Sequence, residues 1–459
     1  MSDFDLLLQK QRLRATFLKT EDFKPRRRRL EALEKWILSH RRDLYQALEK
    51  DLLKSEQETN LSEIYTVLTE IREAKNNLRR WTEKEYVGTT LTYFGSQGYH
   101  FYEPKGVCLI ISPWNYPFNL AIGPVVSAIA AGNTFILKPS EFTPHTSALM
   151  ARMINDLFEE DLGVVIEGDV KVSQELLRLP FDHIFFTGSP NVGKVVMEAA
   201  AKNLTSITLE LGGKSPTIID ETASLKDAAE KIAWGKWLNA GQTCVAPDYL
   251  FIHEQVYDAF MDLFREQMKT AYPEESYTGI ISEKHFSRLS DMIDQAVKLG
   301  AVKHMNENIT NKQKMPPVIL EKPTEEMQVL QEEIFGPILP VLKYSDLEQV
   351  IKYVNSKPKP LSLYFFSRSR SNQERILKST SSGNLVINDC VLQFAHPGLA
   401  FGGESQSGFG KSHGKDGFLA FSNKKAVLEQ RIGLTTAKLL YPPYTRFRKF
   451  VIEFLLRYF

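Results

Sequence analysis

The chain has 459 residues, which is too long for one simple core, so two or three domains are expected. Its composition, 43% hydrophobic and 25% charged, is that of an ordinary globular protein, and a formal net charge of +1 gives no reason to expect nucleic acid or a bulk anionic surface as a partner. Three cysteines do not make a disulfide framework in a chain of this length; they suit a reducing cytoplasm, and because their spacing matches no zinc motif, no metal is expected. No signal-peptide pattern and no run of about 18 apolar residues is visible, so we expect a cytoplasmic protein without a membrane-spanning helix.

The first 85 residues are highly charged and have a helical pattern. Four consecutive arginines at 26–29 could form a nucleic-acid patch, but apolar residues follow them at helical spacing, so a solvated helix face is favoured. Beyond this region the pattern changes, because residues 90–94 and 99–102 flank a Gly-Ser-Gln-Gly turn and predict two strands. We expect this hairpin to be an arm for bridging or oligomerisation.

From Pro104 onward, apolar strand-like runs alternate with helical runs. The expected strands are residues 106–112, 134–138, 164–166, 181–186 and 206–211, with helices at 117–131, 144–158, 170–178 and 192–202. This alternation predicts a parallel, doubly wound sheet, in which ligands bind at the carboxyl ends of the strands. The second half repeats the pattern and predicts a second α/β domain, with helices at 224–238, 256–268 and 282–299 and strands at 249–252, 334–342, 361–366 and 384–387.

The end of the chain differs from the rest. A glycine-rich stretch follows Phe401, and a polar strand-like run occupies residues 421–432. In residues 446–459, six apolar side chains fall on one helical face and four charged side chains on the other. This pattern indicates a helix docked on the protein or on a partner subunit, or alternatively an interfacial helix on a membrane, since cationic amphipathic segments bind lipid surfaces.

One turn carries a chemically distinctive residue, Cys244. It lies in Leu-Asn-Ala-Gly-Gln-Thr-Cys-Val-Ala-Pro, between an expected helix and an expected strand, where neither regular structure forms easily. A scaffold on both sides can therefore present the thiol. A free cysteine is also a common core filler, and from this turn alone that interpretation is at least as good as a nucleophile.

Two further strand ends have residues suited to holding a nucleotide. Lys138 ends a strand, and Glu141 follows three residues later, which favours joint hydrogen bonding to ribose hydroxyls or simply a surface ion pair. The turn from Gly188 to Gly193 lies between a strand and a helix, where backbone amides and the helix N-terminus can hold a phosphate. Its spacing is not Gly-x-Gly-x-x-Gly, and a tight turn without a ligand fits it equally well.

Two polar residues at other strand ends could take part in catalysis. Glu210 ends an apolar strand before two glycines, and a partly desolvated glutamate has the raised pKa that a general base needs near neutral pH. Asn115 follows another strand, and its amide could donate to a developing oxyanion, although a turn or cap asparagine is the simpler local interpretation.

Six short motifs in series resemble the ordered motif set of the aldehyde dehydrogenase superfamily. They are Pro-Trp-Asn-Tyr-Pro at 113–117, Lys-Pro-Ser-Glu at 138–141, Phe-Thr-Gly-Ser at 186–189, Leu-Glu-Leu-Gly-Gly-Lys at 209–214, Gly-Gln-Thr-Cys at 241–244 and Glu-Glu-Ile-Phe-Gly-Pro at 332–337. The short N-terminus and Tyr-Pro-Pro-Tyr at 441–444 resemble the class 3 branch, which includes fatty and aromatic aldehyde dehydrogenases that are commonly dimeric.

The resemblance implies an aldehyde dehydrogenase-like α/β fold with two doubly wound parallel-sheet domains and a small β oligomerisation element. Residues 1–86 and 104–211 would form the NAD(P)-binding domain, residues 212–392 the catalytic domain, and residues 87–103 and 393–459 the bridging element with its amphipathic helix. It also implies a homodimer and a medium- or long-chain aliphatic or an aromatic aldehyde as substrate. The implied cofactor is NAD, with NADP as the alternative, because Glu141 would repel a 2′-phosphate although class 3 relatives often use both.

The resemblance assigns a role to each matched residue. Cys244 corresponds to the nucleophile, Glu210 to the general base, and Asn115 to the side-chain half of the oxyanion hole, with the Cys244 backbone amide as the other half. Lys138 and Glu141 correspond to groups that hold the adenosine ribose. The remaining cofactor contacts are the pyrophosphate turn at Gly188, Ser189 and Gly193, Glu333 on the nicotinamide ribose, and Phe335 beside the nicotinamide.

With these roles the expected reaction is oxidation of an aldehyde to the carboxylic acid through a cysteine thiohemiacetal and a thioester that water hydrolyses. An acylating relative that passes the thioester to coenzyme A is the runner-up, but such relatives tend to lack the base at Glu210. An inactive scaffold on the same fold is the third alternative. The sequence departs from the family at Ala-Phe-Gly-Gly-Glu-Ser (400–405), where Pro-Phe-Gly-Gly is usual, and at His396, where asparagine is common. The resemblance therefore does not decide the shape of the substrate channel.

Overall fold

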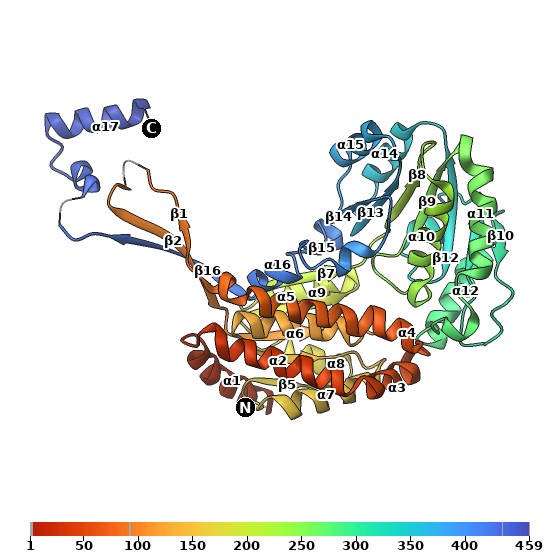
Figure 1. Ribbon diagram of the computed structural model, residues 1–459, viewed down its shortest axis with the longest axis horizontal. Coiled ribbons are helices and arrows are strands. Elements are labelled where there is room, and N and C mark those ends of the chain that lie inside the picture. The colour runs from red at the N-terminus through yellow and green to blue at the C-terminus, as the bar shows by residue number, and fades with distance from the viewer. Residues whose placement is uncertain (1–2, 91–92, 434, 459) are drawn as a thin grey trace.

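The computed structural model describes residues 3–90, 93–433 and 435–458. It consists of two α/β bodies and a slender arm that leaves the first body and carries the C-terminal helix at its far end (Figure 1). None of the helices in the part of the chain that the structure describes combines the length and the apolar character needed to cross a bilayer.

The first body begins with the helices α1 (Asp3–Leu18), α2 (Phe23–Ser39), α3 (Arg41–Leu52), α4 (Glu56–Thr59) and α5 (Tyr65–Thr82), with a π-helical turn between α4 and α5. The arginine run in α2 is only partly the solvated face that the sequence predicts. Arg26 is buried, and its Nη1 donates to the carbonyl of Ala131 at 3.0 Å, where helix α6 (Asn119–Ala131) ends. The last carbonyls of a helix have no intrahelical partner, so this arginine satisfies one of them.

A six-stranded sheet forms the centre of the first body. Its order is β15-β7-β6-β3-β4-β5, and the strands are β3 (Val107–Ile111), β4 (Thr134–Lys138), β5 (Gly163–Val165), β6 (His183–Gly188), β7 (Ser206–Leu211) and β15 (Gly408–Phe409). All neighbours are parallel except β15, which runs antiparallel to β7. The crossovers are α6, α7 (Pro144–Leu157), α8 (Val170–Leu176) and α9 (Pro190–Ala201). Every residue of β3 and β4 is buried, as expected for strands covered on both faces.

A seven-stranded sheet forms the centre of the second body, in the order β10-β11-β12-β9-β8-β13-β14. Its strands are β8 (Pro216–Ile219), β9 (Tyr249–His253), β10 (Val302–Met305), β11 (Val318–Glu321), β12 (Ile338–Tyr344), β13 (Ser362–Phe366) and β14 (Asn384–Ile387). Its helices include α10 (Leu225–Trp237), α11 (Tyr257–Thr270), α12 (Glu283–Lys298), α14 (Leu347–Ser356) and α15 (Arg370–Ser379). The two doubly wound sheets confirm the expected fold class.

The strand expectations for the second body need correction. Strand β12 begins at Ile338 rather than at residue 334, because the preceding residues form a loop that contains Phe335 with φ at +50°. The sequence pattern also missed three strands of four residues each: the buried β8 and β11, and β10, a mostly exposed edge strand whose residues do not alternate in polarity.

The arm is a three-stranded antiparallel sheet in the order β1-β2-β16, made of β1 (Glu85–Val87), β2 (Ser96–Pro104) and β16 (Ser422–Gln430). The hairpin was expected, but its first strand was misplaced: β1 lies before residues 90–94, of which residues 91 and 92 lie outside the described residues. Helix α16 (Gly414–Ala420) precedes β16, and α17 (Arg446–Tyr458) lies beyond it at the outer end of the arm (Figure 1).

Candidate active site

The turn that carries Cys244 connects α10 to β9 and is held in an unusual backbone conformation. Asn239, Ala240 and Gly241 have positive φ values of 54°, 52° and 72°. A side chain at Gly241 would place its Cβ 2.3 Å from the carbonyl oxygen of Gly336, so only glycine fits there. Gln242 fixes the turn from inside, because its Nε2 donates to the carbonyls of Asn239 and Gly279.

Cys244 differs from the other two cysteines in its exposure. Its side chain is partly exposed, whereas Cys108 and Cys390 are buried. Burial of the thiol group, together with the nearby carboxylates of Glu333 and Glu210, raises the pKa of Cys244 to about 12. The thiol is therefore protonated at neutral pH, and a base must accept its proton when the sulfur reacts.

Glu210 is a buried carboxylate with one free oxygen. Its Oε1 accepts a hydrogen bond from Ser412 Oγ at 2.8 Å, while Oε2 has no hydrogen-bond partner among the described residues. Burial raises the pKa of Glu210 to about 7, although Ser412 and the charges of His413 and Lys411 lower it in part. A carboxylate with this pKa can both accept and release a proton near neutral pH.

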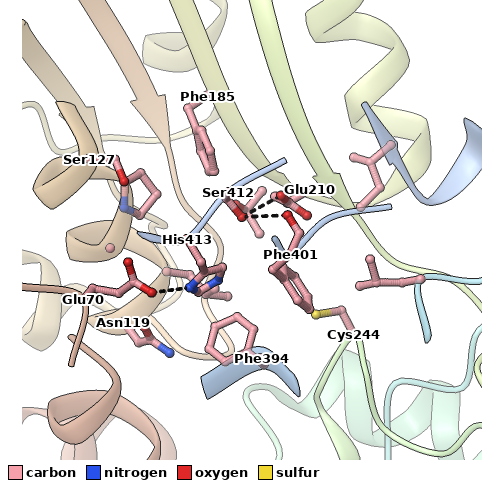
Figure 2. Close-up of a pocket in the computed structure, with 16 residues that line it drawn as sticks. Glu70, Asn119, Ser127, Phe185, Glu210, Cys244, Phe394, Phe401, Ser412 and His413 are labelled. Carbon is pink, nitrogen blue, oxygen red and sulfur yellow. Dashed lines mark hydrogen bonds and ion pairs between the residues drawn. The ribbon is translucent and has the colours of Figure 1, made fainter. Parts of the chain in front are cut away.

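Cys244 and Glu210 come from different bodies and line one cavity (Figure 2). Phe401 and Phe394 form part of its apolar wall, and His413 lies on the side away from the thiol. Sequence reasoning missed Ser412 and His413, although both lie in the glycine-rich stretch that it noted.

A second, strongly apolar cavity also reaches the thiol. Its walls come from the N-terminal helices, from the loop after β3, from the end of α10 and from the segment after β14. The apolar side chains include Leu61, Tyr65, Tyr116, Leu120, Trp234 and Val391. Cys244 thus lies where the two cavities meet.

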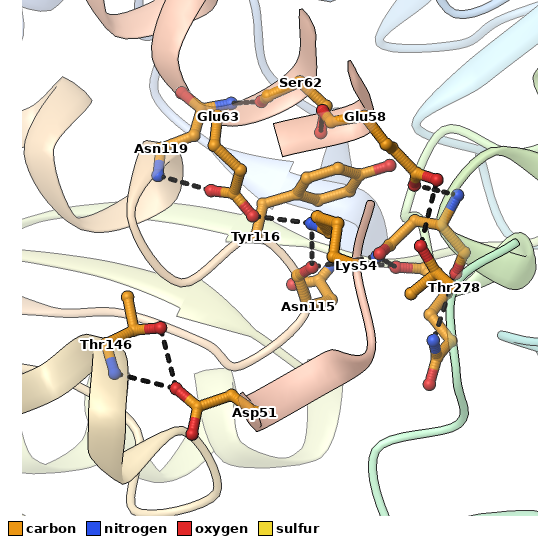
Figure 3. A network of polar contacts seen from close by, with 12 residues as sticks. Asp51, Lys54, Glu58, Ser62, Glu63, Asn115, Tyr116, Asn119, Thr146 and Thr278 are labelled. Atoms are coloured by element: carbon orange, nitrogen blue, oxygen red, sulfur yellow. Dashed lines mark hydrogen bonds and ion pairs between the residues drawn. The ribbon is translucent and has the colours of Figure 1, made fainter. Parts of the chain in front are cut away.

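Asn115 lies beside the thiol turn within a buried polar network (Figure 3). Its Nδ2 donates to the carbonyl of Gln242 at 2.9 Å, and its own carbonyl accepts from Asn239 Nδ2 at 2.8 Å. The same carbonyl lies 3.4 Å from Nζ of Lys54, which forms a fully buried ion pair with Glu63 at 2.6 Å. One amide hydrogen of Asn115 is left for a further acceptor, because the NH₂ group has two.

The expected nucleotide residues lie along one edge of the six-stranded sheet, at the ends of β4 and β6. Lys138 Nζ donates to the carbonyl of Pro139 at 2.6 Å and lies 3.9 Å from the half-exposed carboxylate of Glu141. Ser189 caps α9, since its Oγ accepts from Val192 N at 3.4 Å. Gly188 ends β6, and a Cβ on Gly193 would lie 2.7 Å from Leu211, so these glycines keep the helix close to the sheet.

Glu333 and Phe335 approach the same edge from the second body. Glu333 is partly buried, and this burial, with the neighbouring charge of Asp248, raises its pKa to about 8. Its Oε1 has no hydrogen-bond partner among the described residues, and a Cβ on Gly212 would lie 2.2 Å from its Oε2. Phe335 packs edge-on against Trp114, with ring centroids 5.4 Å apart. A buried carboxylate oxygen without a partner beside a glycine turn fits a ligand with hydroxyl groups, such as a nucleotide ribose.

The residues that depart from the family pattern lie outside both cavities. Ala400 and His396 are exposed, and Glu404 forms a surface ion pair with Lys359 at 3.0 Å. Phe401, between them, is buried and contacts Phe394 and His413. None of the residues His396, Ala400, Glu404 and Ser405 lines either cavity.

Two doubly wound domains, with a glycine turn and polar side chains at the strand ends, are typical of a dinucleotide-dependent oxidoreductase. The aldehyde dehydrogenase family model matches residues 9–427. The 4,4'-diaponeurosporen-aldehyde dehydrogenase of Staphylococcus aureus is 41% identical over 443 residues, which cover 95% of each chain. The rat aldehyde dehydrogenase named "dimeric NADP-preferring" is 40% identical over 432 residues, which cover 93% of this chain and 94% of the relative.

A solved structure, the substrate-bound state of Staphylococcus aureus AldH, has a TM-score of 0.94 at 39% identity and covers 99% of this chain and 100% of its own. The chain belongs to the aldehyde dehydrogenase family. It is an NAD(P)-dependent aldehyde dehydrogenase, as the motif series predicted, and its relatives include class 3 enzymes.

Proposed function

We propose that this aldehyde dehydrogenase works by covalent catalysis at Cys244 and releases the carboxylic acid by hydrolysis, with Glu210 as the general base. The observation that carries the proposal is the shared cavity: a protonated thiol from one body and a carboxylate with a pKa near neutrality from the other. The presence of Glu210 also favours hydrolysis over transfer of the acyl group to coenzyme A, because hydrolysis needs a base that activates water.

The reaction begins at the thiol. Glu210 takes the proton of Cys244 as the sulfur attacks the carbonyl carbon, and the new C–S bond gives a tetrahedral thiohemiacetal. The amide of Asn115 and the backbone amide of Cys244 donate to its oxyanion, an effect typically worth about 3 kcal/mol for each donor. A bound NAD(P) would supply the hydride acceptor that the oxidation needs, and loss of hydride from the thiohemiacetal would leave a thioester on Cys244.

Hydrolysis completes the cycle. Glu210 releases its first proton and then takes one from a water molecule, whose oxygen attacks the thioester carbonyl. The C–S bond breaks, the sulfur regains a proton and the carboxylic acid leaves. A general base of this kind contributes roughly a hundred- to ten-thousand-fold to the rate.

The cofactor roles follow from the same edge of the sheet. Lys138 and Glu141 would hold the adenosine ribose, and the turn formed by Gly188, Ser189 and Gly193 would hold the pyrophosphate. Glu333, whose Oε1 has no hydrogen-bond partner among the described residues, would bind the nicotinamide ribose, and Phe335 would pack beside the nicotinamide. NAD is the expected cofactor because Glu141 repels a 2′-phosphate, and NADP is the alternative, in line with the name of the rat relative.

The apolar cavity selects the substrate. Because its lining is almost wholly hydrophobic, it fits a medium- or long-chain aliphatic or an aromatic aldehyde. The Staphylococcus aureus relative is named for 4,4'-diaponeurosporen-aldehyde, which supports a bulky substrate.

The division into domains follows the sheets. Residues 1–86 and 104–211 form the NAD(P)-binding domain, residues 212–392 the catalytic domain, and residues 87–103 and 393–459 the bridging element. Strands β3 to β7 and β8 to β14 support the first two assignments, while β15 and α16, within 393–459, lie on the first body. The exposed arm supports a homodimer in which it pairs with a second copy, and the amphipathic α17 supports a peripheral contact with lipid.

The test is an assay of NADH and NADPH formation with straight-chain aldehydes of increasing length. We expect kcat/KM to rise by up to about fourfold for each methylene that the cavity buries. Cys244→Ala should abolish oxidation and ester hydrolysis, whereas Cys108→Ala, at a buried cysteine in β3, should retain both. Coenzyme A should change neither rate nor product. Substantial turnover by Cys244→Ala would show that the mechanism is wrong.

A further inference from the structure

The cavity beside Cys244 contains an acid–base pair that the reaction above does not use, Glu70 and His413. Nδ1 of His413 lies 2.7 Å from Oε1 of Glu70, and the amide of Gly414 donates to Oε2 of Glu70 at 2.9 Å. The side chain of His413 is only 12% exposed and that of Glu70 only 9%. Figure 2 shows His413 between Glu70, on helix α5, and Ser412, which is bound to Glu210.

The imidazole of His413 is held in place from several sides. It packs edge-on against Phe394 and Phe401, with ring centroids 4.7 and 5.3 Å apart. The backbone of His413 has φ at +70° and ψ at 143°, a conformation that is costly for any residue with a Cβ. Glycine would fit this position without strain, so the presence of a histidine, fixed by two rings and a carboxylate, points to a use for its side chain.

The use that the geometry offers is electrostatic. His413 and Glu210 line the same cavity, and Ser412, between them in the chain, donates to Glu210 Oε1. Although burial alone lowers the pKa of His413, Glu70 and Glu210 raise it above its ordinary value, which favours the protonated, positively charged form of the ring. The other charge that acts on Glu210 is Lys411, whose Nζ is bound to the carbonyl of Gly402 at 2.6 Å.

We propose that His413, held by Glu70, is a positioning residue for the general base: its imidazolium keeps the Glu210 carboxylate ionised and oriented for deacylation. The inference rests on the proposed role of Glu210. It adds a buried Glu70–His413 pair, from α5 and the segment before α16, to the machinery of the hydrolytic step.

The variants that test this are His413→Asn and Glu70→Gln. Asparagine tolerates a positive φ and can still hydrogen-bond to Glu70, but it carries no charge. Glutamine at position 70 keeps a hydrogen bond to the ring and removes the carboxylate that holds its proton. The readout is the hydrolysis of a p-nitrophenyl ester without cofactor, in which the burst reports acylation of Cys244 and the later steady phase reports deacylation.

In both variants the acid limb of the deacylation rate should move to higher pH by about one pH unit, because Glu210 loses a neighbouring positive charge. The rate well above neutrality, normalised to the burst amplitude, should stay within about twofold of the unmodified protein. His304→Asn is the matched control, since His304 forms a 2.7 Å pair with Glu321 on the outer strands of the other sheet. The His304→Asn variant should show the same pH dependence of the deacylation rate as the unmodified protein.

An unmoved acid limb in either variant would overturn the proposal, and so would an equal loss of rate at every pH, which indicates a merely structural role. Glu210→Gln separates this inference from the proposed function. If Glu210→Gln still deacylates, the assignment of the base is wrong. If it does not, while both other variants keep the original profile, only the role of His413 is wrong.

Discussion

At the scale of single residues, Glu210 shows how an apolar strand prepares a base. Its neighbours on β7 are buried, so the carboxyl group has little water to stabilise its charge, and one hydrogen bond from Ser412 does not offset that loss. The same burial that makes Glu210 useful near neutral pH should therefore cost stability.

Glu210→Gln measures that cost. The folded-state pKa of about 7 lies above the ordinary 4.5, so below pH 4.5 both states hold the proton and the cost vanishes. As the pH rises, the unfolded chain releases the proton first, and the loss of stability grows to about 3 kcal/mol above pH 7. The free energy of unfolding should therefore increase for the variant relative to the unmodified protein between pH 5 and 8. If the difference in the free energy of unfolding between the two proteins, measured by urea denaturation, is the same at pH 5 and at pH 8, this prediction is contradicted.

Much of the site could be predicted from the sequence, and the reason is local. Cys244, Glu210 and Asn115 each lie in a short motif at a strand end or turn, so their chemistry and their surroundings are close together in the chain. The Glu70–His413 pair could not be predicted in this way, because its partners are 343 positions apart and only the packing of α5 beside the last glycine-rich segment joins them.

At the scale of elements, most strands of the first sheet were predicted, whereas several strands of the second sheet were not. β4, β7 and β14 have the predicted bounds, whereas β1 was misplaced and β8, β10 and β11, each only four residues long, were missed. A short exposed strand has no apolar alternation, and only its partner decides which three or four residues pair.

Helix α17 does not pack into either hydrophobic core of the described chain. None of its residues is buried, and the side chains of Phe447, Phe450 and Phe454 are 62%, 66% and 44% exposed. The expectation of a helix docked on the body of the same chain is not met within the described residues, since α17 lies at the outer end of the arm (Figure 1). A partner subunit and a lipid surface remain the alternatives that its pattern supports.

Removal of residues 446–459 tests the lipid alternative. We expect sedimentation with anionic liposomes, or the preference for long-chain aldehydes, to decrease, while turnover of short aldehydes stays the same. Leu204→Ser is the control, because Leu204 is an isolated apolar side chain that is 92% exposed on the first body. Unchanged sedimentation together with an unchanged chain-length profile would exclude this role.

At the scale of the whole molecule, the active site exists only where the two bodies meet. The first body supplies Glu210 and Asn115, and the second supplies Cys244. The buried network in Figure 3 joins them: Glu58 on α4 accepts from the amide of Asn239 at 2.6 Å and from Thr278 at 2.9 Å, while Lys54 pairs with Glu63.

Lys54→Met should destabilise this junction by about 3–5 kcal/mol, because it leaves the carboxylate of Glu63 buried without a cation. Burial raises the pKa of Glu63, so the effect should shrink as the pH falls and the group is protonated. Combination with Glu63→Gln should restore most of the loss. Additive effects of the two substitutions in urea denaturation would show that the pair is not coupled.

The position of Cys244 at the junction of two cavities has an evolutionary consequence. Residues that line the apolar cavity alone, such as Leu61 and Trp234, can change with the size of the aldehyde while the surroundings of Glu210 stay the same. Selection on which molecules enter is thereby separated from selection on how fast the acid leaves. A lineage with this layout can acquire new substrates by drift in a few wall positions and keep one hydrolytic apparatus throughout.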